Sequence, residues 1–270
     1  MVPVGFYAFN TMPKKADLPK TVTNALKGSR GTYSIEIKNL KTGEAYSLNS
    51  HKAYKTGSLY KLWIMAAVFE QIQNGILTGD ETLTGDIESI NEMFNIDTKF
   101  RELTTGTLNF TVNSALLQMI TISHNYASLL LSEKAGLPNI KLFLEKYGFK
   151  ESRITAAAPT STPSDIALFL EKLYKGELAN EEHTNKMVKL LKAQKLNDKL
   201  PKYLPNGTVV AHKTGEIDFL THDAGIIYTK NGDYIIVIFS ESDYPVGAKE
   251  RIAQISKAVY NYFLEKGEKI

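Results

Sequence analysis

Residues 54–69 read Tyr54-Lys-Thr-Gly-Ser58-Leu-Tyr-Lys61-Leu-Trp-Ile-Met-Ala-Ala-Val-Phe69, a glycine-led start followed by a nearly continuous apolar segment. A helix that is apolar on almost every side has to be buried, so this stretch predicts the central helix of the fold. Ser58 and Lys61 share one face of its first turn, where unpaired backbone N–H groups create positive potential. Taken alone, the pair fits a helix cap beside a solvated lysine as well as a catalytic hydroxyl beside an amine.

The composition is that of an ordinary globular protein. The chain has 270 residues, of which 43% are hydrophobic, enough for one large domain or two interleaved lobes. The formal net charge is only +3, and the lysines are spread among acids, so we expect neither nucleic acid nor an anionic membrane surface as a partner. With no cysteine and five scattered histidines, we expect no disulfide, no metal and no cofactor.

The first nine residues form an apolar segment that is too short to span a bilayer and has no charged region before it. This segment stands directly ahead of Lys14 and Lys15. We interpret it as the trimmed end of a longer anchor or export signal.

Strand patterns occur near both ends of the chain. Tyr33, Ile35 and Ile37 alternate with polar residues, and residues 45–48 return as a second strand after a turn. After Gly207, strands are expected at residues 208–213, 224–229 and 234–239, with an Asn-Gly turn joining the last two. Helices are expected at residues 18–27 and 248–263, so they flank the strands at both ends of the chain.

The middle of the chain has helical periodicity. Helices are expected after Ser58 and at residues 111–120, 126–135, 139–147, 164–174 and 183–193. The break at residues 121–125 places Ser123, His124 and Asn125 in a connection between helices. Thr162, Pro163 and Asp165 have the pattern of a capping box at a helix start. We expect only loops and short helical turns between residues 78 and 109.

These elements predict an α/β (α+β) fold. Neither the two early strands nor the three late ones are stable alone, but together they form a five-stranded antiparallel sheet flanked by the terminal helices. Residues 1–56 and 205–270 would make this α/β lobe, and residues 57–204 would form an inserted all-helical lobe. A cleft between the two lobes is where a ligand site is expected.

Three short motifs occur in order along the chain: Ser58-x-x-Lys61, Ser123-His-Asn125 and Lys213-Thr-Gly215. Each is weak by itself, because Ser-x-Asn and Lys-Thr-Gly both occur three times. Context distinguishes these copies, since only Ser123 lies in an interhelical connection and only Lys213 follows an apolar strand. In this order and context, the chain resembles the class A β-lactamases and their close relatives among the DD-peptidases over nearly its whole length.

The resemblance assigns catalytic roles to four residues. Ser58 would be the nucleophile, and Lys61 would be its base if burial and a second cation lowered its pKa. Lys213 would be that cation and would also attract a substrate carboxylate. Ser123 would pass a proton to the leaving nitrogen.

Substrate binding is assigned by the same resemblance to Asn125, Thr214, Gly215 and Glu216. Asn125 would bind the substrate's amide, Thr214 would donate to its carboxylate, and the backbone N–H groups of Ser58 and Glu216 would hold the oxyanion. The Glu216 side chain has no family role. The resemblance further implies a monomer outside the bacterial cytoplasm, periplasmic, secreted or membrane-anchored, whose only membrane contact is the removed segment.

The chain departs from the family's pattern at three places. The family's Glu-x-x-Leu-Asn loop, whose glutamate activates the deacylating water, is absent, and residues 153–162 contain no acid. Glu151 and Asp165 flank this gap without matching the pattern. Ala224 stands where the family's usual arginine is expected, and His124 replaces an acidic residue. We interpret His212 and His222, which lie near the site in sequence, as structural.

Three hypotheses follow from these departures. The chain is a serine acyl hydrolase with slow or altered deacylation, acting on a β-lactam or on another amide or ester. Alternatively, it is a D-Ala-D-Ala peptidase or transpeptidase of cell-wall metabolism, or a sensor that binds a β-lactam once and stays acylated.

Overall fold

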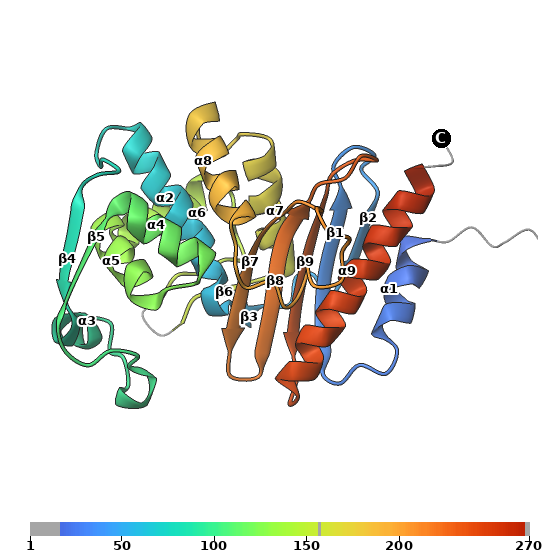
Figure 1. The fold of residues 1–270 in the computed structure, drawn as a ribbon, viewed down its shortest axis with the longest axis horizontal. Coiled ribbons are helices and arrows are strands. Elements are labelled where there is room, and N and C mark those ends of the chain that lie inside the picture. Colours follow the sequence, from blue (N-terminus) through green and yellow to red (C-terminus); the bar gives the residue numbers. More distant parts are fainter. Residues whose placement is uncertain (1–16, 156–157, 268–270) are drawn as a thin grey trace, which may run out of the picture.

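The fold was analysed in a computed structural model, which describes residues 17–155 and 158–267. The apolar segment at residues 1–9 lies outside the described residues. Figure 1 shows a sheet covered by helices on both faces, with the first and last helices at one side and a group of helices at the other.

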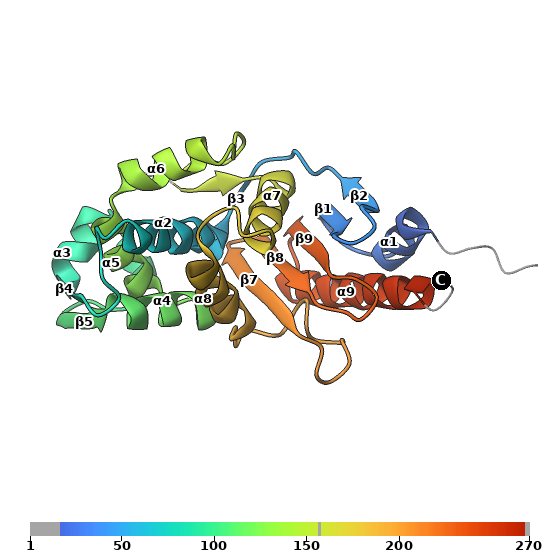
Figure 2. The same cartoon turned by 90° about the horizontal axis from the view of Figure 1, so that it is seen from above.

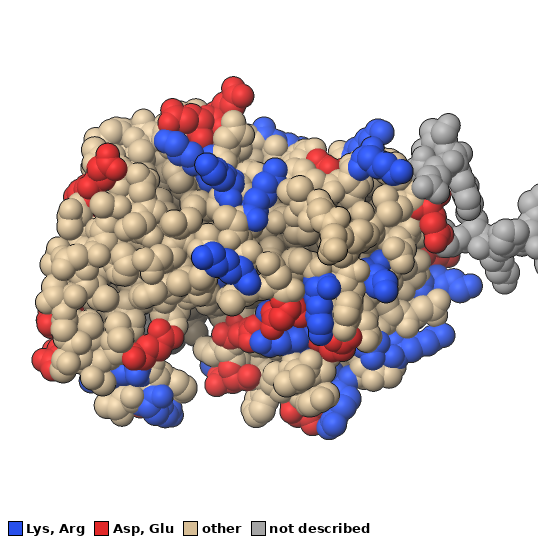
Figure 3. All heavy atoms as spheres, viewed as in Figure 1, with Lys and Arg blue, Asp and Glu red and all other residues tan. Residues whose placement is uncertain are grey.

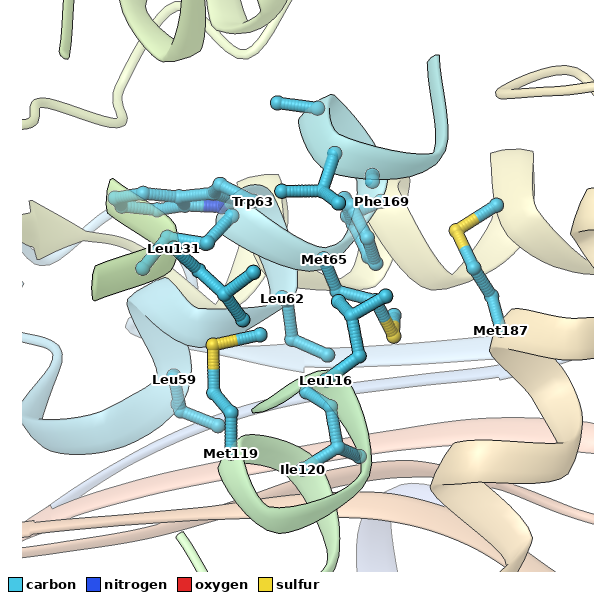
Figure 4. Packing of buried hydrophobic residues seen from close by; sticks show 14 of the residues in the cluster. Leu59, Leu62, Trp63, Met65, Leu116, Met119, Ile120, Leu131, Phe169 and Met187 are labelled. Atoms are coloured by element: carbon cyan, nitrogen blue, oxygen red, sulfur yellow. The ribbon is translucent and has the colours of Figure 1, made fainter. Parts of the chain in front are cut away.

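The predicted central helix is confirmed as α2 (Lys61–Gln73), which follows a 3₁₀ turn at Gly57–Tyr60. Every residue from Lys61 to Phe69 is buried, as the absence of a polar face requires. Figure 4 shows Leu62, Trp63 and Met65 of this helix packed among side chains from several other helices. α2 is therefore the centre of the larger hydrophobic core.

The predicted five-stranded antiparallel sheet is also confirmed, in the order β2-β1-β9-β8-β7. Its strands are β1 (Thr32–Asn39), β2 (Ala45–Leu48), β7 (Val210–Ile217), β8 (Leu220–Ile227) and β9 (Tyr234–Glu241). The expected bounds of β7 were wrong, because the strand continues four residues past Lys213 and pairs with β8 throughout. Lys213, Thr214 and Gly215 thus lie within the outer strand, where the ladder holds them rigidly.

Both faces of the sheet are buried, and β9 shows this most clearly. Ile235, Val237 and Phe239 pack into the core around α2, whereas the alternate residues of β9 pack against the opposite layer. That layer consists of α1 (Leu18–Leu26) and α9 (Pro245–Gly267), which lie side by side in Figures 1 and 2. Each terminal helix covers apolar sheet surface that would otherwise contact water.

The remaining helices lie on the α2 side of the sheet. They are α3 (Ile87–Met93), α4 (Val112–Thr121), α5 (Asn125–Ala135), α6 (Leu137–Lys146), α7 (Pro163–Tyr174) and α8 (Glu181–Lys192). α7 contacts β1 and β9, and α8 contacts β7. The division of the chain into two lobes at residues 56/57 and 204/205 stays a prediction.

The expectation of an all-helical insertion was wrong. Residues 82–86 (β4) and 107–111 (β5) form a two-stranded antiparallel sheet, and β3 (Tyr54–Lys55) pairs with β6 (Thr160–Ser161). Leu83 is buried on one face of β4, while its threonines face outward, an alternation that is typical of a strand. The pairing partner stands more than 20 residues away, so no local turn signal marked this sheet.

Charged side chains of both signs are interspersed on the face drawn in Figure 3. Within the described part of the chain, no helix is long and apolar enough to cross a membrane.

Candidate active site

Ser58 is held in the 3₁₀ turn ahead of α2 by a close approach to strand β7. Gly57 has a φ of +51°, and a Cβ atom there would lie 2.6 Å from the backbone nitrogen of Glu216. A Cβ atom on Gly215 would lie 2.3 Å from the carbonyl oxygen of Thr56. Only glycine permits such backbone contact at both positions, so the start of α2 and the edge of the sheet touch beside Ser58.

The Lys61 side chain is fully buried and points toward the connection between α4 and α5. Its Nζ donates to the Ser123 carbonyl oxygen and to Asn125 Oδ1, both at 2.7 Å, and to Ser123 Oγ at 3.3 Å. Asn125 is the first residue of α5, so only residues 122–124 form the connection that was expected to extend through it.

Ser123 connects the two buried lysines. Its φ is +60°, a left-handed conformation that is uncommon for a residue with a side chain. Its hydroxyl accepts from Lys213 Nζ at 3.0 Å as well as from Lys61. Strained backbone of this kind clusters at functional sites.

Burial lowers the pKa of both lysines. The pKa of Lys61 is well below its ordinary value, first because the ammonium group is buried and then because Lys213 is close, while Glu102 opposes the shift. The pKa of Lys213 is lowered to about 7, again mainly by burial. An amine that loses its proton near neutral pH can act as a base, which an ordinary lysine cannot do.

A cavity of about 310 Å³ opens where these elements meet. It is lined by Ser58, Ser123, Asn125, Leu196, Asp198, Thr214, Glu216 and Lys249. Of the eight site residues predicted from the sequence, five line the cavity directly. Lys61 and Lys213 reach it through Ser123, and Gly215 lies between Thr214 and Glu216 on β7. The tertiary structure thus brings all three motifs together.

The Ser58 hydroxyl makes no hydrogen bond to any of the described residues. The predicted base, Lys61, is instead directed at Ser123 and Asn125. Catalytic hydrogen bonds often reach their final length only in the complex with substrate.

A network of ion pairs at the cavity rim was missed by the sequence reasoning. The Glu216 carboxylate accepts from Lys199 Nζ at 2.5 Å and from Lys249 Nζ at 2.9 Å, and both lysines also contact Asp198. Lys199 is fully buried, so its charge needs these partners. The Glu216 side chain thus anchors strand β7, which carries its backbone nitrogen, and no local motif marked this role.

Glu102 is a second residue that the sequence reasoning missed. Its Oε1 accepts from Asn125 Nδ2 at 2.6 Å. It lies in the segment between α3 and β5, where the irregular sequence carried no signal for a site.

The three histidines near the site have structural contacts. His124 caps α5, since its Nδ1 accepts from the Ala127 backbone nitrogen at 3.1 Å. His212 hydrogen-bonds Asp223 and Asn197. Burial lowers the pKa of His222 to about 4, and its Nε2 donates to the Lys55 carbonyl oxygen at 3.0 Å.

The two acids that flank the missing loop do not line the cavity. Asp165 accepts from the Glu151 backbone nitrogen and the Ser152 hydroxyl, both at 2.8 Å. Thr162 caps α7 as predicted, but it donates its hydroxyl proton to Glu151, and the reciprocal half of the expected capping box is absent. Between Glu151 and Thr162, Arg153 pairs with Thr160 in an isolated antiparallel bridge.

Known proteins are similar to this chain in sequence and in fold. The sequence model of the "Beta-lactamase enzyme family" matches residues 17–263. Beta-lactamase VEB-1 of Pseudomonas aeruginosa is 24% identical over 275 residues, which cover 93% of this chain and 91% of that protein.

Two solved structures share the fold. The β-lactamase from Sphaerobacter thermophilus has a TM-score of 0.78 and 22% identity, covering 92% of this chain and 96% of that one. A mutant of PBP-A, solved as an acyl-enzyme complex with penicillin G, has a TM-score of 0.79 and 22% identity, covering 94% of this chain and 100% of that one.

Proposed function

This chain belongs to the β-lactamase enzyme family, and from that premise we propose that it is a serine acyl hydrolase that forms an acyl-enzyme on Ser58. The substrate is a β-lactam or a related amide or ester, and deacylation is slow or altered. The observation that carries the proposal is the buried pair Lys61 and Lys213, joined by the Ser123 hydroxyl at 3.3 and 3.0 Å beside the cavity that Ser58 lines.

Acylation begins when neutral Lys61 takes the proton of the Ser58 hydroxyl. The Ser58 oxygen then attacks the carbonyl carbon, and the negative charge moves to the carbonyl oxygen. The backbone N–H groups of Ser58 and Glu216 stabilise that oxyanion, since Gly57 and Gly215 allow the two backbones to touch.

Collapse of this intermediate breaks the bond between carbonyl carbon and nitrogen. The Ser123 hydroxyl gives its proton to the leaving nitrogen and recovers one from Lys61, with which it is hydrogen-bonded. The proton removed from Ser58 therefore ends on the leaving nitrogen, and Lys61 returns to its neutral form.

Substrate orientation uses the two sides of the cavity. Lys213 and the Thr214 hydroxyl attract a carboxylate at the edge of β7, and Gly215 allows this strand to lie against the start of α2 beside Ser58. Asn125 binds the substrate's amide on the opposite side. Because Ala224 replaces the expected arginine, carboxylate binding depends on Lys213 and Thr214.

Slow deacylation is proposed because no acid occupies the position of the family's usual base. Residues 152–162 contain no aspartate or glutamate, and Glu151 and Asp165 are engaged in the contacts at α7. The carboxylates that do line the cavity, Asp198 and Glu216, are paired with lysines. A hydrolytic water therefore has no free carboxylate base among these residues.

The lack of a free carboxylate base among these residues also supports a second candidate, a D-Ala-D-Ala peptidase or transpeptidase. Such an enzyme needs the acylation machinery without rapid hydrolysis of β-lactams. The PBP-A mutant with a similar fold formed an acyl-enzyme with penicillin G. A sensor that stays acylated is the third candidate.

The substrates of such a site are β-lactams or peptidoglycan-like peptides, so we propose that the protein acts outside the cytoplasm of a bacterial cell. We further propose that it acts as a monomer.

Intact-mass spectrometry during incubation with penicillin G tests the proposal. The wild-type protein should gain the mass of one penicillin, Ser58→Ala should gain none, and the exposed control Ser47→Ala should behave like wild type. An adduct on Ser58→Ala would refute the site.

The lifetime of the adduct separates the three candidates once free penicillin is removed. Slow loss with release of hydrolysed product supports the hydrolase, and a permanent adduct supports the sensor. Cleavage of a D-Ala-D-Ala peptide by the unmodified protein supports the peptidase.

A further inference from the structure

His212 is a buried, titratable residue that the proposed mechanism does not use. It directly precedes Lys213 on β7, and because successive strand residues point to opposite faces, its ring lies on the other face of the strand from the Lys213 side chain. Gly225 stands opposite His212 on β8, and a Cβ atom there would lie 2.6 Å from the His212 Cβ atom. Glycine at position 225 therefore leaves the room that the His212 side chain needs against β8.

Both nitrogens of the His212 ring face oxygen atoms. Nδ1 lies 2.9 Å from Asp223 Oδ1, and Nε2 lies 3.0 Å from Asn197 Oδ1. The other end of the Asn197 amide fixes its orientation, since Nδ2 donates to the Gln194 carbonyl oxygen at 3.2 Å and a carbonyl oxygen only accepts. Two acceptors need two donors, and only the doubly protonated form of histidine supplies both.

The proton between His212 and Asp223 belongs to the ring. Imidazole is the stronger base of the two groups in water, and the second carboxylate oxygen, Oδ2, accepts from the Leu200 backbone nitrogen at 3.0 Å. A hydrogen bond of this kind stabilises the charged form of a carboxylate. Both side chains are buried, so the imidazolium and the carboxylate compensate each other where either charge alone would be costly.

The contact between His212 and Asn197 fastens one wall of the catalytic cavity. Residues 194–200, the wall segment, lie between α8 and β7 and carry Leu196 and Asp198, which both line the cavity. Asn197 stands between these two residues. Among the described residues, only His212 bonds the Asn197 side chain from outside the wall segment. The ring thus connects the middle of the wall segment to the central sheet.

We propose that His212 is a positioning residue that acts in its doubly protonated form. Bound to Asp223 of β8, the ring holds Asn197 and so keeps the wall segment at the distance from β7 that the substrate requires. Loss of one ring proton would place a nitrogen lone pair against the Asn197 oxygen and release this contact. The role in substrate binding rests on the proposed function, whereas the protonation state of the ring does not.

Nuclear magnetic resonance of the ¹⁵N-labelled full chain tests the protonation state, with His222 as an internal reference. His222 Nδ1 accepts from the Ser240 backbone nitrogen and Nε2 donates to the Lys55 carbonyl oxygen, so this ring has one N–H group. At about pH 7 we expect two protonated ring nitrogens in His212 and one in His222. Correlation of each ring with its own backbone assigns the signals without a variant. An unprotonated nitrogen in the His212 ring would overturn the proposal.

Asn197→Ala tests the positioning role, because it removes the acceptor and keeps the buried pair of His212 and Asp223 intact. We expect the penicillin G concentration that gives half of the maximal acylation rate to rise about fivefold. The rise is limited because Asp198 and Lys199 keep their ion pairs. The maximal rate should change less than about twofold, since the residues that react with the substrate do not belong to the wall segment.

His212→Gln should raise the half-saturating concentration at least as much, since a glutamine side chain has one NH₂ group and an oxygen that cannot donate. Combined with Asn197→Ala, it should cause no further rise from the lost contact, because both substitutions remove the same one. The spectroscopic measurement and Asn197→Ala do not depend on the folding of His212→Gln.

Asn180→Ala is the matched control, because Asn180 Oδ1 also lies against a histidine, 2.8 Å from His183 Nδ1, and neither residue lines the cavity. It should leave both kinetic constants unchanged. An unchanged half-saturating concentration in Asn197→Ala, with adducts still forming, would overturn the positioning role alone. Failure of the wild-type protein to form any adduct would overturn the proposed function and the positioning role together, while the spectroscopic result would still decide the protonation state.

Discussion

Replacement of Lys213 by methionine tests the electrostatic basis of acylation most directly. Lys61 can take the Ser58 proton only in its neutral form, and Lys213 is the cation that favours that form. Methionine fills a similar buried volume without a charge. The variant should therefore keep the fold and bring Lys61 closer to the behaviour of an ordinary lysine.

The size of the effect follows from the position of the two amines around Ser123. Their Nζ atoms lie 3.3 and 3.0 Å from the same hydroxyl oxygen, so they are no farther apart than the sum of these distances, about 6.3 Å. Two unit charges at that distance repel by about 2.6 kcal/mol at an effective dielectric constant of 20. This energy corresponds to nearly a hundredfold in the ratio of neutral to protonated Lys61.

The assay is the pH dependence of Ser58 acylation under single-turnover conditions. The acylation rate should rise with pH as Lys61 loses its proton, and this rise is the acidic limb of the pH–rate profile. In Lys213→Met the acidic limb should move to higher pH. Because the pKa of Lys213 is lowered to about 7, its full charge is present only on the acidic side, and the difference is largest there. Lys213→Arg keeps the charge and should leave the limb near its wild-type position.

The position of the limb separates this effect from loss of substrate binding. Removal of the cation that attracts a substrate carboxylate lowers the rate at every pH without moving the limb. If Lys213→Met acylates more slowly but with an unchanged pH profile, Lys61 is not the base whose charge Lys213 controls.

Three further predictions concern backbone contact, packing and pH. Gly57→Ala should lose acylation, because its Cβ atom would displace the Glu216 backbone. The control Gly75→Ala has a similar φ of +71° but open space around it, so it should lose only about 1–2 kcal/mol of stability. Equal acylation rates in the two variants would contradict the role of the contact between Gly57 and Glu216. Leu62→Ala should reduce the free energy of unfolding by about 2–5 kcal/mol in urea denaturation, since Leu62 is fully buried, and a loss below about 1 kcal/mol would show that this core can collapse around the gap. Burial lowers the pKa of His222 from 6.5 to about 4 in the folded protein, so between these pH values the unfolded chain binds more protons than the folded one. The free energy of unfolding should therefore fall as pH drops from about 6.5 to 4, with a slope of at most about 1.4 kcal/mol per pH unit. His222→Gln should remove that part of the slope, and an identical slope in both proteins would argue against a buried neutral His222.

The local sequence was sufficient for most of the regular structure. The uninterrupted apolar run after Ser58 requires a buried helix, and the alternation in β1 and the continuous apolar residues in β9 require strands. Strands β4 and β5 were missed because they pair across more than 20 residues, so no turn signal between them marked their short alternating segments as a sheet. The length of β7 was underestimated because Thr214, Gly215 and Glu216 interrupt its apolar pattern, although all three pair with β8.

The site divides in a similar way. The order of the three motifs along the chain carries the resemblance to the class A β-lactamases, and that resemblance assigned Ser58, Lys61, Ser123 and Lys213. The roles of Glu102, Lys199 and Lys249 depend on contacts between segments that are far apart in sequence, where no spacing rule applies.

The sequence by itself thus determined which helix is central and which residue types stand at its start, since both follow from periodicity and spacing within a few turns. Only the tertiary structure decided that two lysines share the Ser123 hydroxyl, that Glu102 faces Asn125 and that neither Glu151 nor Asp165 lines the cavity. Proton affinities and charge contacts depend on distances and burial, and folding sets these between residues that the chain itself keeps far apart.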